Sequence, residues 1–490
     1  MKQQMTFHFD SNACSGCKAC QTACKDKHNL AADQVWRNVF EVSGGVWQKA
    51  GDAWVPDVYA YHLSISCNHC EKPICAEVCP AKALSKRDDG IVVLDNKKCL
   101  GCGYCSWVCP YNALQYIETE GHMSKCTFCA DELDEGKPPS CVSACPMRVL
   151  DYGGLEDIEK KYEHQSKPAS LPNNDLTEPS LSIHAHHADR TDLSAKIFPA
   201  KQAGLQERSL VAFTLLSQMA AGAAVILGLL NLFPLQQLWI LSFNKTAYPV
   251  IGLIMAGSMM FSLFHLGTPL KFYRSILNIK TSWLSREIIA AALLIGMISL
   301  SGLSYWADGF AFFTSQYAGS LPAFFGIVFI FSMSRIYMMR TVPVWNTFWT
   351  MLSFYISSFI LGLTCIFVLS QFAGMNLWKS INQFQNLLLL LIVLLGIEII
   401  VRIKQRQFFL NKIVQADGNA ETNGCTNLYR CSTAFNVSAI ILLVPAVLFT
   451  DLPWIKDQTM ILMIVTGVII LAAEVIGRYI FYKSYFRYGV

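Results

Sequence analysis

The chain has 490 residues, of which 53% are apolar and 15% are charged, and its formal net charge is +4. This apolar content excludes a disordered chain, and basic residues placed between long apolar runs argue against a nucleic-acid-binding protein. Residues 1–208 carry 22 Lys or Arg against 27 Asp or Glu (net −5), whereas residues 209–490 carry 17 against 8 (net +9). Because 16 of the 19 cysteines lie between Cys14 and Cys145, the composition predicts a soluble, cofactor-rich head followed by a membrane body.

We expect three parts along the chain: a head at 1–154, a polar tail and linker at 155–208, and a membrane domain at 209–490. The head consists of short apolar stretches interrupted by Cys, Gly and Pro, and residues 91–94 are typical of a strand. The linker is rich in Pro, Asn and Ser, and a short charged helix is expected at 156–161.

Three histidines lie close together in this linker: His184, His186 and His187. Such a group can bind a metal. In a polar segment rich in Pro and Ser, however, solvated side chains are the better interpretation.

Sixteen cysteines form four groups of four, and each group ends in Cys-x3-Cys. The groups are Cys14, Cys17, Cys20 and Cys24; Cys67, Cys70, Cys75 and Cys79; Cys99, Cys102, Cys105 and Cys109; and Cys126, Cys129, Cys141 and Cys145. In this spacing three thiolates of one loop reach three irons of a cubane cluster, while the fourth cysteine turns to a neighbouring cluster. The sixteen thiolates therefore predict four [4Fe-4S] clusters.

Pairing the first group with the fourth, and the second with the third, gives four predicted ligand sets. They are Cys14, Cys17, Cys20 with Cys145; Cys126, Cys129, Cys141 with Cys24; Cys67, Cys70, Cys75 with Cys109; and Cys99, Cys102, Cys105 with Cys79. Structural zinc also takes four cysteines, but this is not zinc-ribbon spacing, and metal ligation explains it better than disulfides do. Since the head offers no acid, base or nucleophile for a substrate, we interpret it as a conductor of single electrons.

Eight apolar runs follow the linker, each near the ~20 residues that span a bilayer. They are 209–230, 247–269, 287–306, 320–340, 347–371, 385–402, 433–450 and 459–480. Buried helices of a soluble protein could imitate one or two such runs, but not eight in succession. We therefore predict an all-α bundle of eight transmembrane helices.

Lys and Arg are distributed unevenly over the connections between these runs. The connections after the second, fourth and sixth runs and the C-terminal tail hold fourteen: Lys271, Arg274, Lys280, Arg286, Arg335, Arg340, Arg402, Lys404, Arg406, Lys412, Arg430, Arg478, Lys483 and Arg487. The opposite connections hold three: Lys245, Lys379 and Lys456. Cytoplasmic loops are enriched in Lys and Arg. An even number of spans puts the head on the same side of the membrane as the fourteen Lys and Arg residues.

The topology therefore predicts a multi-pass protein of the bacterial cytoplasmic membrane with its head on the cytoplasmic face. Residues 1–10 show neither an apolar signal segment nor a twin-arginine pair. We accordingly expect that the head is not exported by a signal sequence of its own.

The membrane domain has one histidine, His265, at the head-side end of the second run. It could be a simple interface residue, or a neutral imidazole that takes a proton from a quinol hydroxyl. Glu287, at the start of the third run, could pass the proton on or only favour the helix N-terminus. Arg335, near the end of the fourth, could orient a quinone oxygen or extend to the membrane surface.

Other polar residues of the membrane domain have plainer interpretations. Two pairs lie four residues apart, Glu398 with Arg402 and Glu474 with Arg478, and are expected to be structural ion pairs. Three cysteines outside the head, namely Cys365, Cys425 and Cys431, lack ligand spacing and are interpreted as ordinary apolar or loop residues. A single histidine does not suggest haem b, so electrons would pass directly from a quinol to the nearest cluster.

The motifs resemble two subunits of one enzyme family. The head resembles the four-cluster electron-transfer subunit of dimethyl sulfoxide reductase at Cys14 to Cys24, Ser64 to Cys70, Cys99 to Pro110 and Gly121 to Cys126. The membrane domain resembles the eight-span anchor subunit at His265 to Pro269, Arg335 to Trp345 and Glu474 to Arg478. The cysteine motifs are shared with formate, nitrate and polysulfide enzymes, and the anchor motifs narrow the resemblance to dimethyl sulfoxide reductase. Together the two resemblances cover nearly the whole chain, which looks like a natural fusion of the two subunits.

The resemblance implies an α+β ferredoxin-like head of two pseudo-symmetric two-cluster modules followed by the eight-helix bundle. It also implies menaquinol oxidation at a site that includes His265, with Glu287 and Arg335 as further candidates. Electrons would then reach a separate molybdopterin-containing catalytic subunit that reduces dimethyl sulfoxide or a related S- or N-oxide in anaerobic respiration. The expected partners are this subunit, the quinone pool and membrane lipid.

Three alternatives stay open. Relatives often reach the periplasm with a catalytic subunit that bears the export signal, so a periplasmic head is the alternative to a cytoplasmic one. Fusion makes that route harder, because the folded head would have to cross the membrane before the spans insert. The chain could instead serve a polysulfide, thiosulfate or formate type of molybdoenzyme and reduce quinone. It could also be a metal-stabilised membrane scaffold without a redox role.

Overall fold

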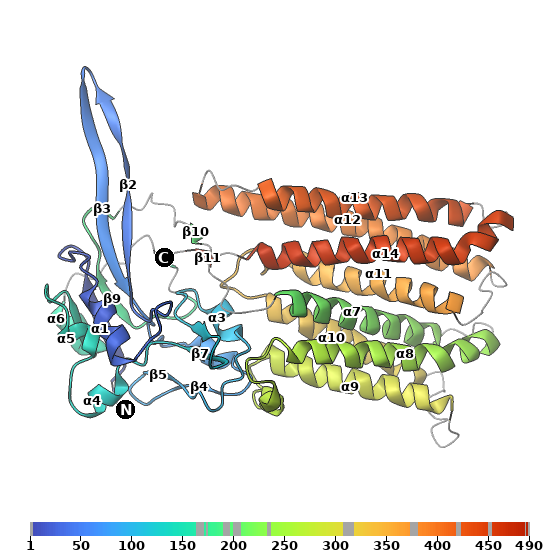
Figure 1. Cartoon of the computed structure of the whole chain (residues 1–490), viewed down its shortest axis with the longest axis horizontal. Coiled ribbons are helices and arrows are strands. Elements are labelled where there is room, and N and C mark those ends of the chain that lie inside the picture. The colour runs from blue at the N-terminus through green and yellow to red at the C-terminus, as the bar shows by residue number, and fades with distance from the viewer. Residues whose placement is uncertain are drawn as a thin grey trace.

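Figure 1 shows the computed structural model of the chain, with a small α/β head at one end and a bundle of long helices at the other. The structure describes residues 3–162, 171–172, 175–189, 197–198, 207–232, 237–306, 318–372, 381–417, 423–448, 453–485 and 487–488. Much of the predicted linker lies outside these residues. The predicted fold class, an α+β ferredoxin-like head followed by an all-α membrane domain, is confirmed.

The strand β1 (Met5–Asp10) is the centre of a three-stranded sheet in the head. It pairs antiparallel with β8 (Leu150–Gly154) and parallel with β9 (Leu181–His184). Phe7 and Phe9 of β1 are buried in the core of the head. Because β9 belongs to the predicted linker, this segment returns to the head and completes its sheet before the chain continues to the membrane.

Two short hairpins and six short helices surround the cysteines. β4 (Leu84–Lys86) pairs with β5 (Val92–Leu94), and β6 (Gln115–Ile117) pairs with β7 (His122–Ser124). The helices are α1 (Ala19–Lys27), α2 (Ile74–Glu77), α3 (Tyr104–Val108), α4 (Ala130–Asp134), α5 (Ser140–Ser143) and α6 (Leu155–Lys161). The strand expected at 91–94 and the helix expected at 156–161 are confirmed by β5 and α6.

The internal repeat is visible in the backbone as well as in the cysteine spacing. Three of the four groups end in Cys-Pro, and the third residue after each of these cysteines has a positive φ: Lys82 (49°), Asn112 (51°) and Arg148 (56°). Left-handed backbone is uncommon for residues other than glycine. The three Cys-Pro turns therefore share one unusual local conformation.

A long hairpin projects from the head. Its strands β2 (Asn38–Ala50) and β3 (Ala53–Ile65) pair antiparallel over 13 residues each, which corresponds to about 40 Å. Figure 1 shows it standing away from the remainder of the head. Its base is buried at Ile65, whereas Trp47 and Trp54 near its tip are 59% and 62% exposed. The sequence did not predict this hairpin.

The membrane domain contains eight long helices in the described part of the chain. They are α7 (Glu207–Leu230), α8 (Gln237–Leu263), α9 (Trp283–Ser304), α10 (Leu321–Tyr337), α11 (Phe348–Phe372), α12 (Ile381–Asp417), α13 (Asn423–Leu448) and α14 (Pro453–Lys483). The short helices η1 (Pro269–Ile276) and η3 (Ala318–Ser320) precede α9 and α10, and β10 (Ile197–Phe198) pairs with β11 (Arg487–Tyr488).

Seven of these helices are long and apolar enough to cross a membrane. The fourth predicted span corresponds to α10, an apolar helix of only 17 residues. At 1.5 Å per residue it is about 25 Å long, somewhat shorter than the ~30 Å hydrocarbon core. The structure thus supports seven of the eight predicted spans by length and composition, and the fourth corresponds to a shorter apolar helix.

The helices alternate in direction, and the head covers one end of the bundle. α7 packs against α8, α10 and α11. Figure 1 shows the α8–α9 and α10–α11 connections, the last turns of α12 and the first turns of α13 at the end nearest the head. These are the connections rich in Lys and Arg. Of the three opposite lysines, Lys245 lies over the ring of Trp306 at the end of α9, whereas Lys379 and the side chain of Lys456 lie outside the described residues.

Candidate functional site

The sixteen head cysteines come together in four sets of neighbouring thiols, which we name by position. They are the membrane set (Cys79, Cys99, Cys102, Cys105), the second set (Cys67, Cys70, Cys75, Cys109), the third set (Cys24, Cys126, Cys129, Cys141) and the outer set (Cys14, Cys17, Cys20, Cys145). Each set takes three cysteines from one sequence group and one from another. These are the four combinations that the spacing predicts.

The four sets lie in a row. The electrostatic contacts between successive sets are Cys105 with Cys75, Cys67 with Cys126, and Cys141 with Cys20. At one end, the membrane set touches the membrane domain; at the other, Cys17 of the outer set is exposed to solvent. The row therefore runs from the membrane domain to the surface of the head.

The chemistry of these thiols fits an iron-sulfur cofactor. They form no disulfides with one another, and most of them are buried. Burial raises the pKa of Cys126 to about 11 and the pKa values of Cys102 and Cys129 to about 12, because a desolvated thiolate is costly. Iron would supply the positive charge that such thiolates need. Peptide N–H groups also face sulfur atoms; the N–H of Phe128 donates to Sγ of Cys126 at 3.4 Å.

No group of three or more His, Cys, Asp or Glu side chains within the described ranges is arranged to hold a single metal ion. The three linker histidines contact separate partners: His184 an Asp10 carboxylate oxygen (3.3 Å), His186 the ring of Tyr61, and His187 Oδ1 of Asn12 (3.2 Å). They take part in the packing of the linker on the head.

The loop between α8 and α9 binds the membrane set directly. The N–H of Thr268 donates to the carbonyl of Leu100 (3.1 Å), and its Oγ1 donates to the carbonyl of Cys99 (3.2 Å). Asn278 donates through Nδ2 to the carbonyl of Cys79 (3.0 Å). Since Cys79 and Cys99 come from different sequence groups, one loop of the membrane domain positions both parts of the set.

The other side of the membrane set is held through α3. The hydroxyl of Tyr104 donates to the carbonyl of Ile336 at the end of α10, and the hydroxyl of Tyr485 donates to the carbonyl of Trp107, both at 3.3 Å. The ring of Trp107 meets that of Trp345 edge to face, with centroids 5.8 Å apart. The head is thus fixed on the bundle by contacts to residues next to these cysteines.

A mainly apolar cavity of about 280 Å³ lies directly beneath this contact. Its walls come from α7, α8, η1, α9 and the head: Phe213, Ala256, Met259, Met260, Ser262, Leu263, His265, Leu266, Phe272, Ser275, Leu284, Glu287, Ile288, Ala291, Ala292, Ile295 and Leu100. Leu100 is the residue after Cys99, so the cavity reaches the backbone of the membrane set. Apolar walls with few polar groups are typical of a site for a small apolar ligand.

His265 and Glu287 are the two ionisable residues that line this cavity. Nδ1 of His265 is buried and has no hydrogen-bond partner in the described part of the chain. Glu287 is 3% exposed, and no described cation lies within salt-bridge distance of it. Buried polar groups without partners are costly. Both side chains are therefore available to a polar group of a ligand in the cavity.

Arg335 does not line the cavity. Its guanidinium lies over the ring of Trp283, with the central carbon 5.1 Å from the centroid, and its Nε is buried without a partner among the described residues. Tyr104 interacts electrostatically with Arg335, with the cavity residue Glu287 and with Cys102. Burial, followed by the Glu287 carboxylate, raises the pKa of Tyr104. Sequence reasoning missed Tyr104, because its significance depends on where α3 contacts the bundle.

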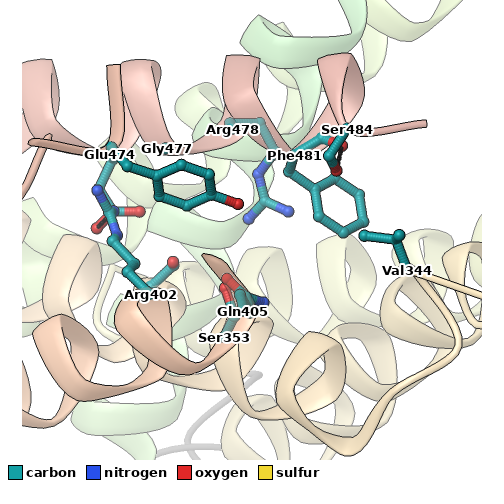
Figure 2. Close-up of a pocket in the computed structure, with 11 residues that line it drawn as sticks. Val344, Ser353, Arg402, Gln405, Glu474, Gly477, Arg478, Phe481 and Ser484 are labelled. Carbon is teal, nitrogen blue, oxygen red and sulfur yellow. Dashed lines mark hydrogen bonds and ion pairs between the residues drawn. The ribbon is translucent and has the colours of Figure 1, made fainter. Parts of the chain in front are cut away.

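Figure 2 shows a second, polar cavity in the other half of the bundle. Its lining residues are Val344, Ser353, Ser357, Arg402, Gln405, Tyr429, Glu474, Gly477, Arg478, Phe481 and Ser484. Its volume of about 30 Å³ holds about one or two water molecules. The cavity is thus too small for a ligand of the size that the first cavity admits.

The charged residues around this second cavity form an ion network between helices. Arg402 pairs with Glu398 on α12, as expected, and also donates to Glu474 on α14 at 2.9 Å. The expected pair of Glu474 with Arg478 is wrong. Arg478 instead donates to Oε1 of Gln218 on α7 (2.6 Å). Helix spacing permitted the pair, but tertiary packing supplied closer partners on neighbouring helices.

Two cysteines of the membrane domain have the surroundings of ordinary residues. Cys365 is buried among apolar side chains of α11, and Cys431 is exposed on α13. The side chain of Cys425 lies outside the described residues.

The fold and these sites define a multi-pass membrane protein with an iron-sulfur electron-transfer head. Residues 201–483 match the family described as the DMSO reductase anchor subunit (DmsC), and residues 58–155 match a 4Fe-4S dicluster domain. Because the first match covers more than half of the chain, the protein belongs to the DMSO reductase anchor subunit family. The anchor domain and the seven apolar helices make it a multi-pass protein of the inner membrane.

The head is similar to separate iron-sulfur subunits. The matching component of anaerobic dimethyl sulfoxide reductase is 48% identical over 183 residues in Escherichia coli K12 and 43% over 182 residues in Haemophilus influenzae. Each match covers 37% of this chain and 89% of the relative. A component of sulfite dehydrogenase from Allochromatium vinosum is 38% identical over 172 residues, which cover 32% of this chain and 72% of that protein. One polypeptide thus joins an iron-sulfur subunit to an anchor subunit.

Proposed function

We propose that the chain oxidises menaquinol in the cavity of His265 and Glu287 and delivers the electrons through four [4Fe-4S] clusters to a separate molybdopterin-containing subunit. That subunit would reduce dimethyl sulfoxide or a related S- or N-oxide. The main support is that one apolar cavity contains both ionisable candidates and ends at Leu100, next to Cys99 of the membrane set. We propose the same three parts of the chain, with boundaries at 154 and 208, and with β9 of the linker packed on the head.

Oxidation of one quinol releases two electrons and two protons. In the proposed reaction, Nδ1 of His265 accepts a proton from a quinol hydroxyl, which requires a neutral imidazole within hydrogen-bond reach. The Glu287 carboxylate takes up a proton next in the same cavity. Apolar walls exclude water and hold the quinol ring, so that its oxygen faces the two residues.

The electrons leave the cavity at the membrane set. Each set would hold one [4Fe-4S] cluster, which accepts and releases one electron at a time. The row of sets gives the order: membrane, second, third and outer. Thr268 and Asn278 support this route, since they fix the membrane set against the loop that carries His265.

The terminal substrate is tested anaerobically in native membranes. The clusters are first reduced with a menaquinol analogue and followed by their paramagnetic signals, and dimethyl sulfoxide is then added. We expect the signals to appear and then to decay. Signals that persist would mean that the partner uses another substrate.

A dehydrogenase that reduces quinone is the second candidate function. It is supported by the similarity of the head to the sulfite dehydrogenase component and to the iron-sulfur subunit of formate dehydrogenase from Wolinella succinogenes, which is 33% identical over 196 residues. The same experiment tests this direction of electron flow. Oxidised membranes whose clusters become reduced on addition of sulfite or formate, without quinol, would favour it.

Three glycines allow the close contact between head and membrane loop: Gly101, Gly121 and Gly267. A Cβ on Gly267 would lie 2.0 Å from the backbone oxygen of Gly121. We expect Gly267→Ala to push the head away from the cavity and to slow reduction of the clusters by quinol roughly 10- to 100-fold. Rapid-freeze electron paramagnetic resonance measures this rate.

The matched control for Gly267→Ala is Gly257→Ala on α8, where nothing lies within 4 Å of the added Cβ. We expect the wild-type rate in the control and an unchanged iron content in both variants. Equal rates in Gly267→Ala and the control would show that the close contact is not needed for electron transfer.

The catalytic partner is proposed to bind at the outer set, where the row of thiols reaches the surface. The base of the long hairpin contacts this set: Oγ of Ser64 lies 3.4 Å from Sγ of Cys20. The register places Trp47 opposite Pro56 and Trp54 opposite Lys49, so both tryptophans lie on one face of the hairpin. Exposed tryptophans on a hairpin whose base lies at the electron exit are suited to anchoring a partner subunit.

The double variant Trp47→Asp with Trp54→Asp is expected to reduce co-purification of the catalytic subunit at least about 10-fold. Loss of one anchor residue that contributes ~1.4 kcal/mol to the binding free energy has this effect. Iron content and reduction of the clusters by quinol should not change. Gln48→Asp, on the opposite face of the same strand, is the control and should bind normally. Equal recovery of the subunit with both variants would rule out the hairpin as its anchor.

The head is proposed to face the cytoplasm, on the side of the Lys- and Arg-rich connections. Protease added to right-side-out spheroplasts is expected to leave the head intact and to cleave it only after the spheroplasts are opened. Cleavage of the head in intact spheroplasts would place it in the periplasm instead.

A further inference from the structure

Two positive side chains are buried in the head between the thiol sets. Arg37 and Lys125 are each only 2% exposed. Arg37 donates to the carbonyl of Ser64 (3.1 Å) and to Oγ of Ser66 (3.0 Å). Lys125 donates through Nζ to the carbonyls of Val92 and Cys126, the latter at 2.8 Å. All these acceptors are neutral oxygens.

Neither cation has a carboxylate partner in the part of the chain that the structure describes. Within the described ranges, no Asp, Glu or chain terminus lies within the 4 Å of a salt bridge to Arg37 or to Lys125. A buried charge without a counter-charge is expensive, and proteins normally pair it or bind it to a metal centre. The remaining groups of opposite charge near these side chains are the thiolates.

The two cations occupy successive gaps in the row. Arg37 interacts electrostatically with Cys141, Cys126 and Cys24 of the third set and with Cys20 of the outer set. Lys125 interacts with Cys75 of the second set and with its neighbour Cys126 of the third set. Arg37 is also fixed by the ring of Phe7, whose centroid lies 4.6 Å from its guanidinium carbon.

We propose that Arg37 and Lys125 are the counter-ions of the inner electron route and raise the reduction potentials of the clusters on either side of them. Four thiolates leave each cluster with net negative charge, and reduction adds one more. A fixed cation nearby in a medium of low dielectric therefore favours the reduced state. The two residues are positioning residues for electron transfer rather than ligands, and the inference rests on the proposed four-cluster assignment.

The test is a redox titration of the four clusters in membranes, followed by electron paramagnetic resonance. Arg37→Gln should shift the potentials of the third and outer clusters downward, and Lys125→Met should do so for the second and third. The membrane-set cluster should not move in either variant. Unchanged potentials in variants that keep four clusters, or an equal shift of all four, would overturn the proposal.

Charge-conserving variants and an exposed control separate the effect of charge from that of side-chain shape. Arg37→Lys and Lys125→Arg should assemble four clusters with potentials close to wild type, even if the neutral variants lose clusters. Loss of clusters in both the neutral and the charge-conserving variants would mean that side-chain shape is needed, and would contradict the proposal. Lys137→Met removes an exposed cation that pairs with Glu135 at 2.7 Å, and should change nothing because water screens it. A wild-type protein without four iron-sulfur signals would instead refute the proposed function.

Discussion

His265→Ala is expected to block reduction of the clusters by menaquinol while leaving all four clusters in place. His265 is the only histidine of the membrane domain, and its buried Nδ1 faces no protein partner in the described structure. General base catalysis is worth about 10²- to 10⁴-fold, so quinol-dependent reduction should fall by a factor in this range. A soluble chemical reductant, which does not need the cavity, should still reduce every cluster.

Two further variants sharpen this test. Glu287→Gln keeps the shape of the cavity but removes the second proton acceptor, and should give a smaller decrease than His265→Ala. Phe264→Ala changes the neighbouring side chain, which is 65% exposed and does not line the cavity, and should behave as wild type. Unchanged quinol reduction in His265→Ala would remove this histidine from the reaction.

Cys102→Ser is expected to damage the cluster of the membrane set and to isolate the other three from quinol. Cys102 lies in the set that touches the membrane domain, beside Cys79 and Cys99. If this cluster is the entry point, its loss should abolish reduction of the second, third and outer clusters by menaquinol. The same three clusters should still respond to a soluble reductant, as followed by electron paramagnetic resonance.

Cys17→Ser is the matched control, because Cys17 lies in the outer set at the other end of the row. It should damage only the outer cluster, leave reduction of the other three by quinol intact, and stop transfer to the catalytic partner. Quinol reduction of the second cluster at the wild-type rate in Cys102→Ser would contradict the proposed order.

Much of the architecture could be predicted because it depends on local pattern. The cysteine spacing anticipated the four combinations of thiols, and apolar runs located the helices of the membrane domain. The charges of the connections also anticipated that the head covers the Lys- and Arg-rich end of the bundle. Boundaries were less certain: α12 (Ile381–Asp417) extends well beyond the run at 385–402, since its polar C-terminal turns have no apolar signal.

Features that depend on contacts distant in sequence could not be predicted. Glu474 pairs with Arg402 on another helix, 72 residues away, instead of with Arg478 one turn along α14. Tyr104 lies between two cysteines in the sequence, and only the contact of α3 with the bundle distinguishes it from its neighbours. Buried cations such as Arg37 carry no sequence signal either, because a single Arg in a head of mixed charge is most simply expected at the surface.

The most direct test of the account is an anaerobic titration of the intact chain with a menaquinol analogue, monitored by electron paramagnetic resonance, after iron and acid-labile sulfide have been measured. We expect about sixteen of each per chain, from four cubane clusters. We also expect reduction signals that grow with added quinol and that appear about 10²- to 10⁴-fold more slowly in His265→Ala. A fully loaded protein whose clusters respond to a soluble reductant but stay oxidised in the presence of quinol would contradict it.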